Sequence, residues 1–186
     1  MSLTHPDKIV LVGIMGAGKS TVGRSLAERI GYAFVDLDEE VERETGRSIP
    51  QIFSELGESA FRQLEVSVSE RQDAARRTVL AAGGGWMARP GLRDRWPDAV
   101  RVWLRVSPEE AWARISEAAD DRPMLDPARP REALQRLLAE REAEYEQAEI
   151  SVPTGGATVA ETVDLILELI PFVGRPAPTD SAVPGS

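Results

Sequence analysis

The sequence predicts a three-layer α/β/α fold with a central parallel sheet of about five strands. Three observations carry this prediction: short continuous apolar runs, stretches of helical periodicity between them, and a glycine-rich turn after the first run. Continuous apolar runs are typical of strands that are covered on both faces. Their alternation with helices predicts βαβ units with right-handed crossovers. A chain of 186 residues can bury one sizeable core, so we expect one domain.

The elements follow in order along the chain. The first predicted strand, residues 8–13, reads Lys-Ile-Val-Leu-Val-Gly, and a helix over residues 21–30 follows it and ends at Gly31. Further strands are predicted at residues 33–35, 78–82, 100–106 and 150–152. Further helices are predicted at residues 39–44, 48–56, 59–76, 108–117, 131–148 and 159–170.

Two segments lack periodicity. Residues 118–130 contain charged residues around three prolines, which predicts an exposed, mobile loop. Residues 171–186 contain four prolines and two glycines, which predicts a disordered tail. The predicted domain therefore spans residues 1–170.

Composition excludes several kinds of chemistry. The chain has no cysteine and a single histidine, His5, so thiolate, zinc and histidine acid–base sites are not expected. A formal charge of −9 disfavours nucleic acids and anionic membranes as partners. No signal peptide or long apolar run is evident, so we expect a cytoplasmic protein. Only two of the 22 basic residues are lysines, and we interpret Lys8 as a solvated residue before a strand.

The second lysine belongs to the strongest motif in the chain. Residues 13–20 read Gly-Ile-Met-Gly-Ala-Gly-Lys-Ser and match the phosphate-binding P-loop pattern, with an apolar strand before them and an amphipathic helix after them. Such a loop directs backbone N–H groups at an anion, while Lys19 reaches the β- and γ-phosphates and Ser20 ligates Mg²⁺. The predicted ATP-binding set from this motif is Gly13, Gly16, Ala17, Gly18, Lys19, Ser20 and Thr21. A glycine-rich turn that binds nothing is the weaker alternative.

Two carboxylates follow the second predicted strand, in the run Val35-Asp36-Leu37-Asp38. Side chains at i and i+2 of a strand share a face, so both can line the cleft at the carboxyl edge of the sheet. One could serve the metal and the other a substrate hydroxyl. Alternatively, Asp38 caps the helix that begins at Glu39. The absence of asparagine excludes the guanine-reading motif of GTPases, and the chain is too short for an AAA-type motor.

Together these residues resemble the shikimate kinase family over residues 8–170. The resemblance rests on motifs in the family's order: the P-loop with Thr21, Asp36-x-Asp38, Gly46-Arg47-Ser48-Ile49 with Ile52-Phe53, Gly57-Glu58 with Phe61-Arg62-x-x-Glu65, Gly83-Gly84-Gly85, Arg122-Pro123-x-Leu125, and Arg141 with Tyr145. It implies a P-loop kinase fold with a mobile lid over about residues 118–130. It also implies an enzyme that uses ATP and Mg²⁺ to phosphorylate the 3-hydroxyl of shikimate. We expect the protein to be a monomer.

The resemblance also implies roles for individual residues. Arg62 and Arg141 would clamp the shikimate carboxylate, and Asp38 would hold the reacting hydroxyl. Asp36 would act on the magnesium side through water, and Arg122 would reach the transferred phosphate from the lid. The substrate set is Asp38, Arg62, Gly83, Gly84, Gly85 and Arg141; the catalytic set is Lys19, Asp38 and Arg122; and the metal set is Ser20 and Asp36.

Four further positions leave alternatives open. Glu65, three residues after Arg62 on a predicted helix, either orients that guanidinium or makes a generic surface pair. Arg114 would stack on adenine, and it belongs with Arg122 to the ATP-binding set; the turn at residues 154–157 lacks the arginine that some members use at the adenine. Trp86, after the triple glycine, either forms a pocket wall or packs in the core.

The rival functions are another small-metabolite kinase, such as a gluconate kinase, and a non-catalytic nucleotide-binding module.

Overall fold

The computed structural model describes residues 5–117 and 129–170. The predicted tail, Arg122 and nearly all of the predicted lid lie outside the described residues. Among the described helices, none combines the length and apolar character that crossing a bilayer requires.

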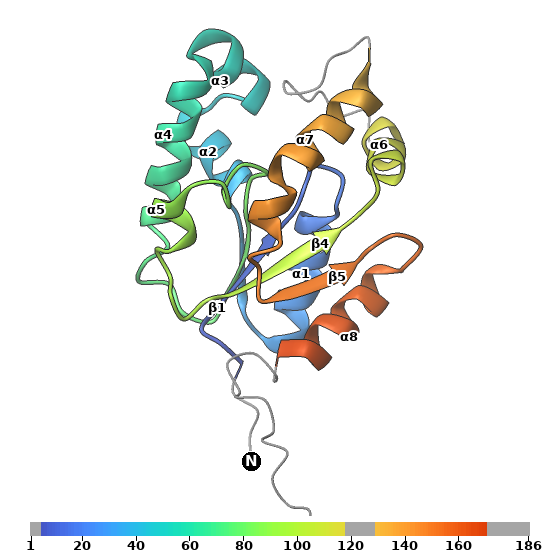
Figure 1. The fold of residues 1–186 in the computed structure, drawn as a ribbon. Coiled ribbons are helices and arrows are strands. Elements are labelled where there is room, and N and C mark those ends of the chain that lie inside the picture. The colour runs from blue at the N-terminus through green and yellow to red at the C-terminus, as the bar shows by residue number, and fades with distance from the viewer. Residues whose placement is uncertain (1–4, 118–128, 171–186) are drawn as a thin grey trace, which may run out of the picture.

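A five-stranded, wholly parallel sheet forms the centre of the molecule, as predicted (Figure 1). Its strands are β1 (Lys8–Val12), β2 (Ala33–Asp36), β3 (Thr78–Ala81), β4 (Val100–Arg105) and β5 (Ile150–Pro153), in the spatial order β2-β3-β1-β4-β5. All five residues of β1 are buried, which explains the unbroken apolar run. The strand's two neighbours, β3 and β4, lie on opposite sides of it, so the chain order reverses direction at β1.

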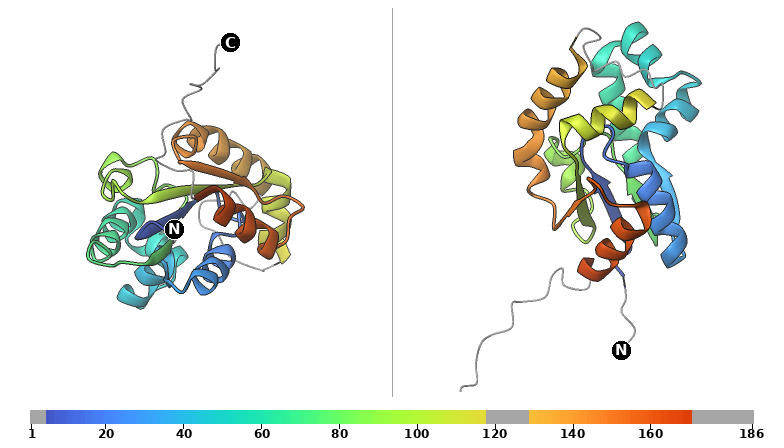
Figure 2. Two further views of the ribbon diagram at one scale, coloured as in Figure 1. Left: turned by 90° about the horizontal axis from the view of Figure 1, so that it is seen from below. Right: turned by 90° about the vertical axis from the view of Figure 1, so that its right-hand side faces the viewer.

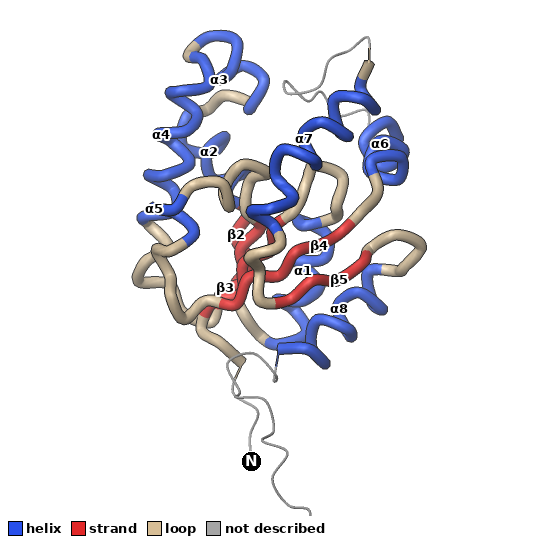
Figure 3. Tube along the Cα trace, viewed as in Figure 1, coloured by secondary structure: helices blue, strands red, loops and turns tan. Residues whose placement is uncertain are grey.

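Helices connect the strands and cover both faces of the sheet. They are α1 (Lys19–Ile30), α2 (Leu37–Thr45), α3 (Ile49–Glu55), α4 (Gly57–Glu70), α5 (Pro90–Arg93), α6 (Pro108–Glu117), α7 (Pro130–Tyr145) and α8 (Val159–Leu169). Helices α1 and α8 pack together on one face, and α7 lies on the opposite face (Figure 2). Helices α2, α3 and α4 gather beside the β2 edge of the sheet (Figure 3). The three-layer prediction is therefore confirmed.

The helix predicted over residues 59–76 ends earlier, at Glu70. A turn replaces its last part, and the carbonyls of Asp73 and Ala75 in this turn accept hydrogen bonds from the Lys8 ammonium. Lys8 is only 8% exposed and lies 5.6 Å from the centre of the Trp96 ring. The interpretation of Lys8 as solvated is therefore wrong, and its burial lowers its pKa.

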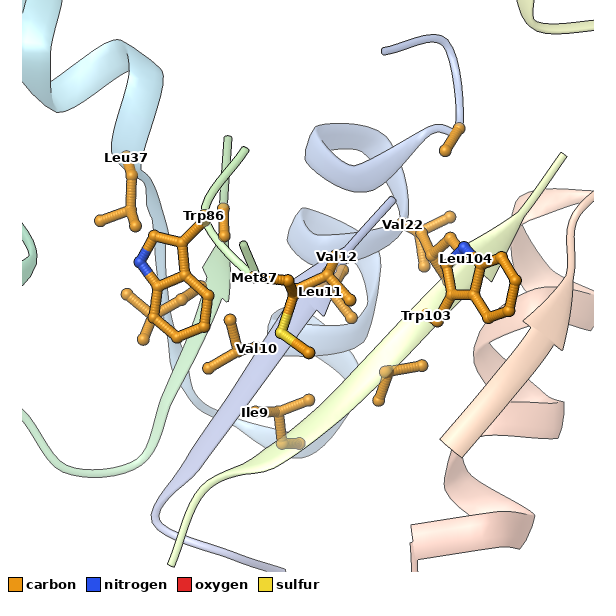
Figure 4. Close-up of a cluster of buried hydrophobic side chains, with 14 of the residues drawn as sticks. Ile9, Val10, Leu11, Val12, Val22, Leu37, Trp86, Met87, Trp103 and Leu104 are labelled. Carbon is orange, nitrogen blue, oxygen red and sulfur yellow. The ribbon is translucent and has the colours of Figure 1, made fainter. Parts of the chain in front are cut away.

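The segment after the triple glycine turns into the core. Trp86 is fully buried, in the apolar cluster that Figure 4 shows. It donates from Nε1 to Ser69 Oγ at 3.2 Å and stacks on Trp96 with 5.7 Å between the ring centres. Trp86 therefore packs in the core and forms no pocket wall. The short helix α5, which was not predicted, begins with Pro90 at its first turn, a position that suits proline because no intrahelical N–H is needed there.

Candidate active site

A cleft of about 590 Å³ opens at the carboxyl edge of the sheet. Its lining comes from the loops after β1 and β3, from the end of β2, and from residues of α1, α2, α3, α4, α6 and α7. Ligands of open α/β folds bind at this edge because strand-to-helix loops converge there. The cleft therefore collects residues that are more than 100 positions apart in the chain, from Met15 to Arg141.

The P-loop forms the first end of the cleft. Gly16 has φ +78°, and a Cβ on it would lie 2.6 Å from Ala111 O, so only glycine fits this close approach to α6. The Lys19 ammonium donates to Gly13 O at 2.9 Å and to Ile14 O at 3.0 Å, which folds the side chain back along the loop. The predicted residues that line the cleft are Gly16, Gly18, Lys19, Ser20 and Thr21; Gly13 and Ala17 are not among the lining residues.

Asp36 lies at the carboxyl end of the second strand, as predicted, but it also has a role that was not predicted. It is the last residue of β2 and the N-cap of α2, where its carboxylate accepts from the N–H groups of Asp38 at 3.0 Å and Glu39 at 3.4 Å. Its other oxygen accepts from Ser20 Oγ at 2.5 Å. The suggestion that Asp38 caps this helix is therefore wrong. Asp38 lies in the first turn of α2, so the shared strand face was the wrong reason, although both carboxylates line the cleft.

An arginine held by two carboxylates forms the second end of the cleft. Arg62 on α4 donates to Glu58 at 2.9 Å and to Glu65 Oε2 at 3.2 Å. Glu65 is 1% exposed, so its ion pair with Arg62 is buried and is not the surface pair of the alternative interpretation. Burial lowers the pKa of Arg62, but hydrogen bonds and charge from Glu58 and Glu65 outweigh burial and leave that pKa above its ordinary value. Arg62 therefore stays cationic.

Sequence reasoning missed Arg89, which lies behind this pair. Its Nη1 donates to Arg62 O at 3.2 Å, and its Nε lies 3.8 Å from Glu65 Oε2. A second cation thus faces the buried carboxylate. Because the chain contains so many arginines, no sequence signal singled this one out.

The triple glycine brings these charged groups together. A Cβ on Gly83 would lie 2.6 Å from Glu65 Oε1 and 3.2 Å from Asp38 Oδ1. A Cβ on Gly84 would lie 2.8 Å from Arg141 Nη1, and one on Gly85 would lie 2.9 Å from Arg62 Nη1. Each glycine therefore leaves space for a charged side chain of α2, α4 or α7. The structure thus brings the residues predicted to bind substrate together around this one loop.

Arg114 on α6 lies at the P-loop end. It donates to Gly16 O at 3.2 Å, to Thr154 Oγ1 at 3.3 Å and to Thr154 O at 2.6 Å. The guanidinium therefore joins the P-loop to the turn after β5. The role of Thr154 as its partner was not predicted, because nothing in the local sequence shows that this turn reaches α6.

Tyr145 contacts the site from behind. Its hydroxyl donates to Gly84 O at 2.6 Å, and the residue is 1% exposed. The sequence placed it next to Arg141 in one motif but did not assign it a contact.

A P-loop at the edge of a parallel sheet, with a carboxylate pair and a second cationic end in the same cleft, defines a P-loop kinase of a small molecule. Comparison with known proteins specifies the family. The family profile described as "Shikimate kinase" matches residues 15–171. The chain accordingly belongs to the shikimate kinase family, as the sequence motifs predicted.

Individual relatives agree with this assignment. The chain is 41% identical over 166 residues to a shikimate kinase of Synechococcus elongatus, covering 89% of this chain and 87% of that one. It is 42% identical over 163 residues to one of Nitrobacter winogradskyi, covering 87% and 76%. Its fold matches a shikimate kinase of Acinetobacter baumannii solved in complex with shikimate, with a TM-score of 0.84, 36% identity, and 89% and 93% of the two chains covered.

The sheet and helices also resemble those of a gluconokinase from Sinorhizobium meliloti, with a TM-score of 0.61, 22% identity, and 89% and 92% of the two chains covered. At this identity the likeness shows a shared fold and nothing about the acceptor.

Proposed function

We propose that this chain transfers the γ-phosphate of ATP to the 3-hydroxyl of shikimate. The observation that carries the proposal is the single cleft that joins a phosphate-binding loop to a second cationic end formed by Arg62 and Arg141. Shikimate is a small carboxylate with hydroxyls, so its site needs cations for the carboxylate and an acceptor beside the reacting hydroxyl. Asp38 lies in the same cleft and is that acceptor.

At the nucleotide end, the P-loop N–H groups and Lys19 bind the phosphates of ATP. Gly13 and Ala17 support the loop from outside the cleft lining, and Arg114, which lines the cleft, would contact the adenine. The lid arginine, Arg122, adds positive charge at the transferred phosphate when the lid closes. Lid and lid arginine rest on the motif alone.

Ser20 and Asp36 would hold Mg²⁺. A hydroxyl and a carboxylate oxygen 2.5 Å apart at the cleft fit a hard cation that takes oxygen ligands and keeps several waters. When bound, the ion neutralises charge that develops on the phosphate oxygens. Because Asp36 also caps α2, its carboxylate is already fixed before any ligand arrives.

At the acceptor end, Arg62 and Arg141 bind the carboxylate, and the glycines at 83–85 let the ring approach the backbone. Asp38 accepts a hydrogen bond from the 3-hydroxyl. As the bond from this oxygen to the γ-phosphorus forms, the bond from the γ-phosphorus to the β-γ bridging oxygen breaks, and the hydroxyl proton passes to Asp38. The products are shikimate 3-phosphate and ADP, and Asp38 then releases its proton to solvent.

We further propose that residues 1–170 act as one domain and as a monomer, without nucleic acid or membrane partners, in the cytoplasm. The core of the described residues gathers around one sheet, which supports one domain, and the net charge of −9 disfavours nucleic acids and anionic membranes.

One assay tests the proposed function. ADP release from ATP and Mg²⁺ is measured with and without shikimate, with gluconate and nucleoside monophosphates as control acceptors. We expect turnover that depends on shikimate. Turnover with gluconate instead would support the rival kinase, and no acceptor-dependent turnover would support the binding module; either result contradicts the proposal.

A further inference from the structure

Tyr145, the last residue of α7, is buried behind the cleft and is not among the residues that line it. Its ring stacks on Trp103 of β4, with 5.8 Å between the ring centres. Its hydroxyl donates to Gly84 O at 2.6 Å. The side chain therefore joins α7 and the central sheet to the glycine loop.

A second residue of α7, Arg141, approaches the same glycine as Tyr145. Arg141 precedes it by four residues, so the two side chains lie on the same face of the helix, one turn apart. Both approach Gly84: a Cβ there would lie 2.8 Å from Arg141 Nη1 and 3.6 Å from Tyr145 Oη. One helix thus supplies a cation of the cleft and a hydroxyl that fixes the loop beside that cation.

The hydrogen bond has a directional consequence for the loop. A trans peptide points its C=O and N–H in opposite directions. When Tyr145 holds Gly84 C=O, the N–H of Gly85 must therefore point away from Tyr145. Glycines have the greatest backbone freedom, so the orientation of a Gly-Gly peptide depends on contacts from outside. Within the loop, the Trp86 N–H donates to Gly83 O at 3.0 Å, a bond that leaves the Gly84–Gly85 peptide itself unrestrained.

We propose that Tyr145 is a positioning residue for the acceptor end of the cleft. Its hydroxyl fixes the Gly84–Gly85 peptide and sets the distance between the glycine loop and the Arg141 guanidinium. This inference rests on the proposed function, because it assigns Tyr145 to the binding of shikimate rather than of ATP.

The Tyr145 hydroxyl stays protonated, and so remains a hydrogen-bond donor, over the pH range in which enzymes work. Burial raises the pKa of Tyr145 to about 12, although the neighbouring Arg141 charge lowers it in part. The contact with Gly84 O is therefore insensitive to pH near neutrality.

The test is the Tyr145→Phe substitution, which removes one oxygen and leaves the stacking ring in place. The matched control is Tyr32→Phe, since Tyr32 is the other tyrosine of the chain, its hydroxyl donates to His5 O at 3.4 Å, and it does not line the cleft. We expect Tyr145→Phe to raise KM for shikimate roughly tenfold, in line with the loss of one buried hydrogen bond, and to leave KM for ATP within about twofold. Tyr32→Phe should change neither constant.

A merely structural role predicts something else. If Tyr145→Phe lowers the melting temperature but leaves KM for shikimate unchanged, or raises both KM values equally, the inference is wrong. Failure of the proposed function is recognised separately, because the unmodified protein would then show no shikimate-dependent turnover at all.

Discussion

Asp36 and Asp38 are two residues apart and have different environments. Asp36 is fixed by Ser20 and by two backbone N–H groups, whereas Asp38 lies in the first turn of α2 and contacts the backbone of Gly83 so closely that a Cβ added there would lie 3.2 Å from Asp38 Oδ1. The Asp36 carboxylate, which the serine and the helix N-terminus hold in place, suits a constant partner such as a metal. The Asp38 carboxylate lines the cleft from the first turn of α2, where it suits a substrate group that exchanges a proton during turnover.

This difference predicts the effect of Asp38→Asn. An amide cannot accept the hydroxyl proton, so we expect kcat to fall by roughly 10²–10⁴-fold. Affinity for ADP should stay within about twofold, because Asp38 is outside the P-loop. Steady-state kinetics and titration calorimetry measure the two quantities. An unchanged kcat would show that Asp38 only lines the cleft.

At the scale of elements, the glycine loop is tightly enclosed. A Cβ on Gly83 would meet Glu65 Oε1, and Glu65 is buried and paired with Arg62, so it has little room to move. Displacing a packed group usually costs about 1–3 kcal/mol.

We therefore expect Gly83→Ala to raise KM for shikimate roughly tenfold or more while KM for ATP stays unchanged. Gly91→Ala is the matched control, because nothing lies within 4 Å of a Cβ at that position. Kinetics of the two variants side by side provide the measurement. Equal KM values for shikimate would mean that the loop adjusts without cost.

The end of α4 depends on Lys8. The Lys8 ammonium binds two turn carbonyls and contacts Trp96, so it holds the turn after α4 against the start of β1. Without it, both carbonyls lose a partner in a partly buried setting.

Accordingly, Lys8→Met should lower the free energy of unfolding by about 1–3 kcal/mol, with kcat unchanged. Urea unfolding followed by circular dichroism measures the loss. Arg43→Met serves as the control, since the Arg43 side chain is 74% exposed and its pair with Glu40 contributes little. If both variants are equally stable, Lys8 is no structural residue.

At the scale of the whole molecule, the cleft has two separate groups of cationic residues, one at each end. Arg114 connects α6, the P-loop and the turn at Thr154, all at the nucleotide end, and Arg62 and Arg141 lie at the glycine loop. A protein of charge −9 can therefore still bind two anions, because cations gather where the anions are to sit.

This separation predicts that Arg114→Ala raises KM for ATP roughly tenfold, through the loss of charged hydrogen bonds that order the P-loop. KM for shikimate should not change. Initial rates with each substrate varied in turn distinguish the two. A rise in both constants would contradict the separation of the two ends.

The sequence predicts those features of the fold and the site that depend on the spacing of residues close together in the chain. The P-loop, the five strands and most helices follow from glycine positions and apolar periodicity, and the family motifs bring Arg62, Arg141 and the triple glycine together. The roles of Asp36, Lys8, Trp86 and Tyr145 do not follow in this way. Each depends on which distant backbone group faces the side chain, and local spacing carries no information about that.

The two lysines have one further consequence. Lys8 is buried under the turn after α4, and Lys19 lies in the P-loop, so no other position of the chain carries a side-chain amine. Isotopic labelling of lysine side chains would therefore give two magnetic resonance signals. One would be a fixed internal reference for folding, and the other would report directly on nucleotide occupancy.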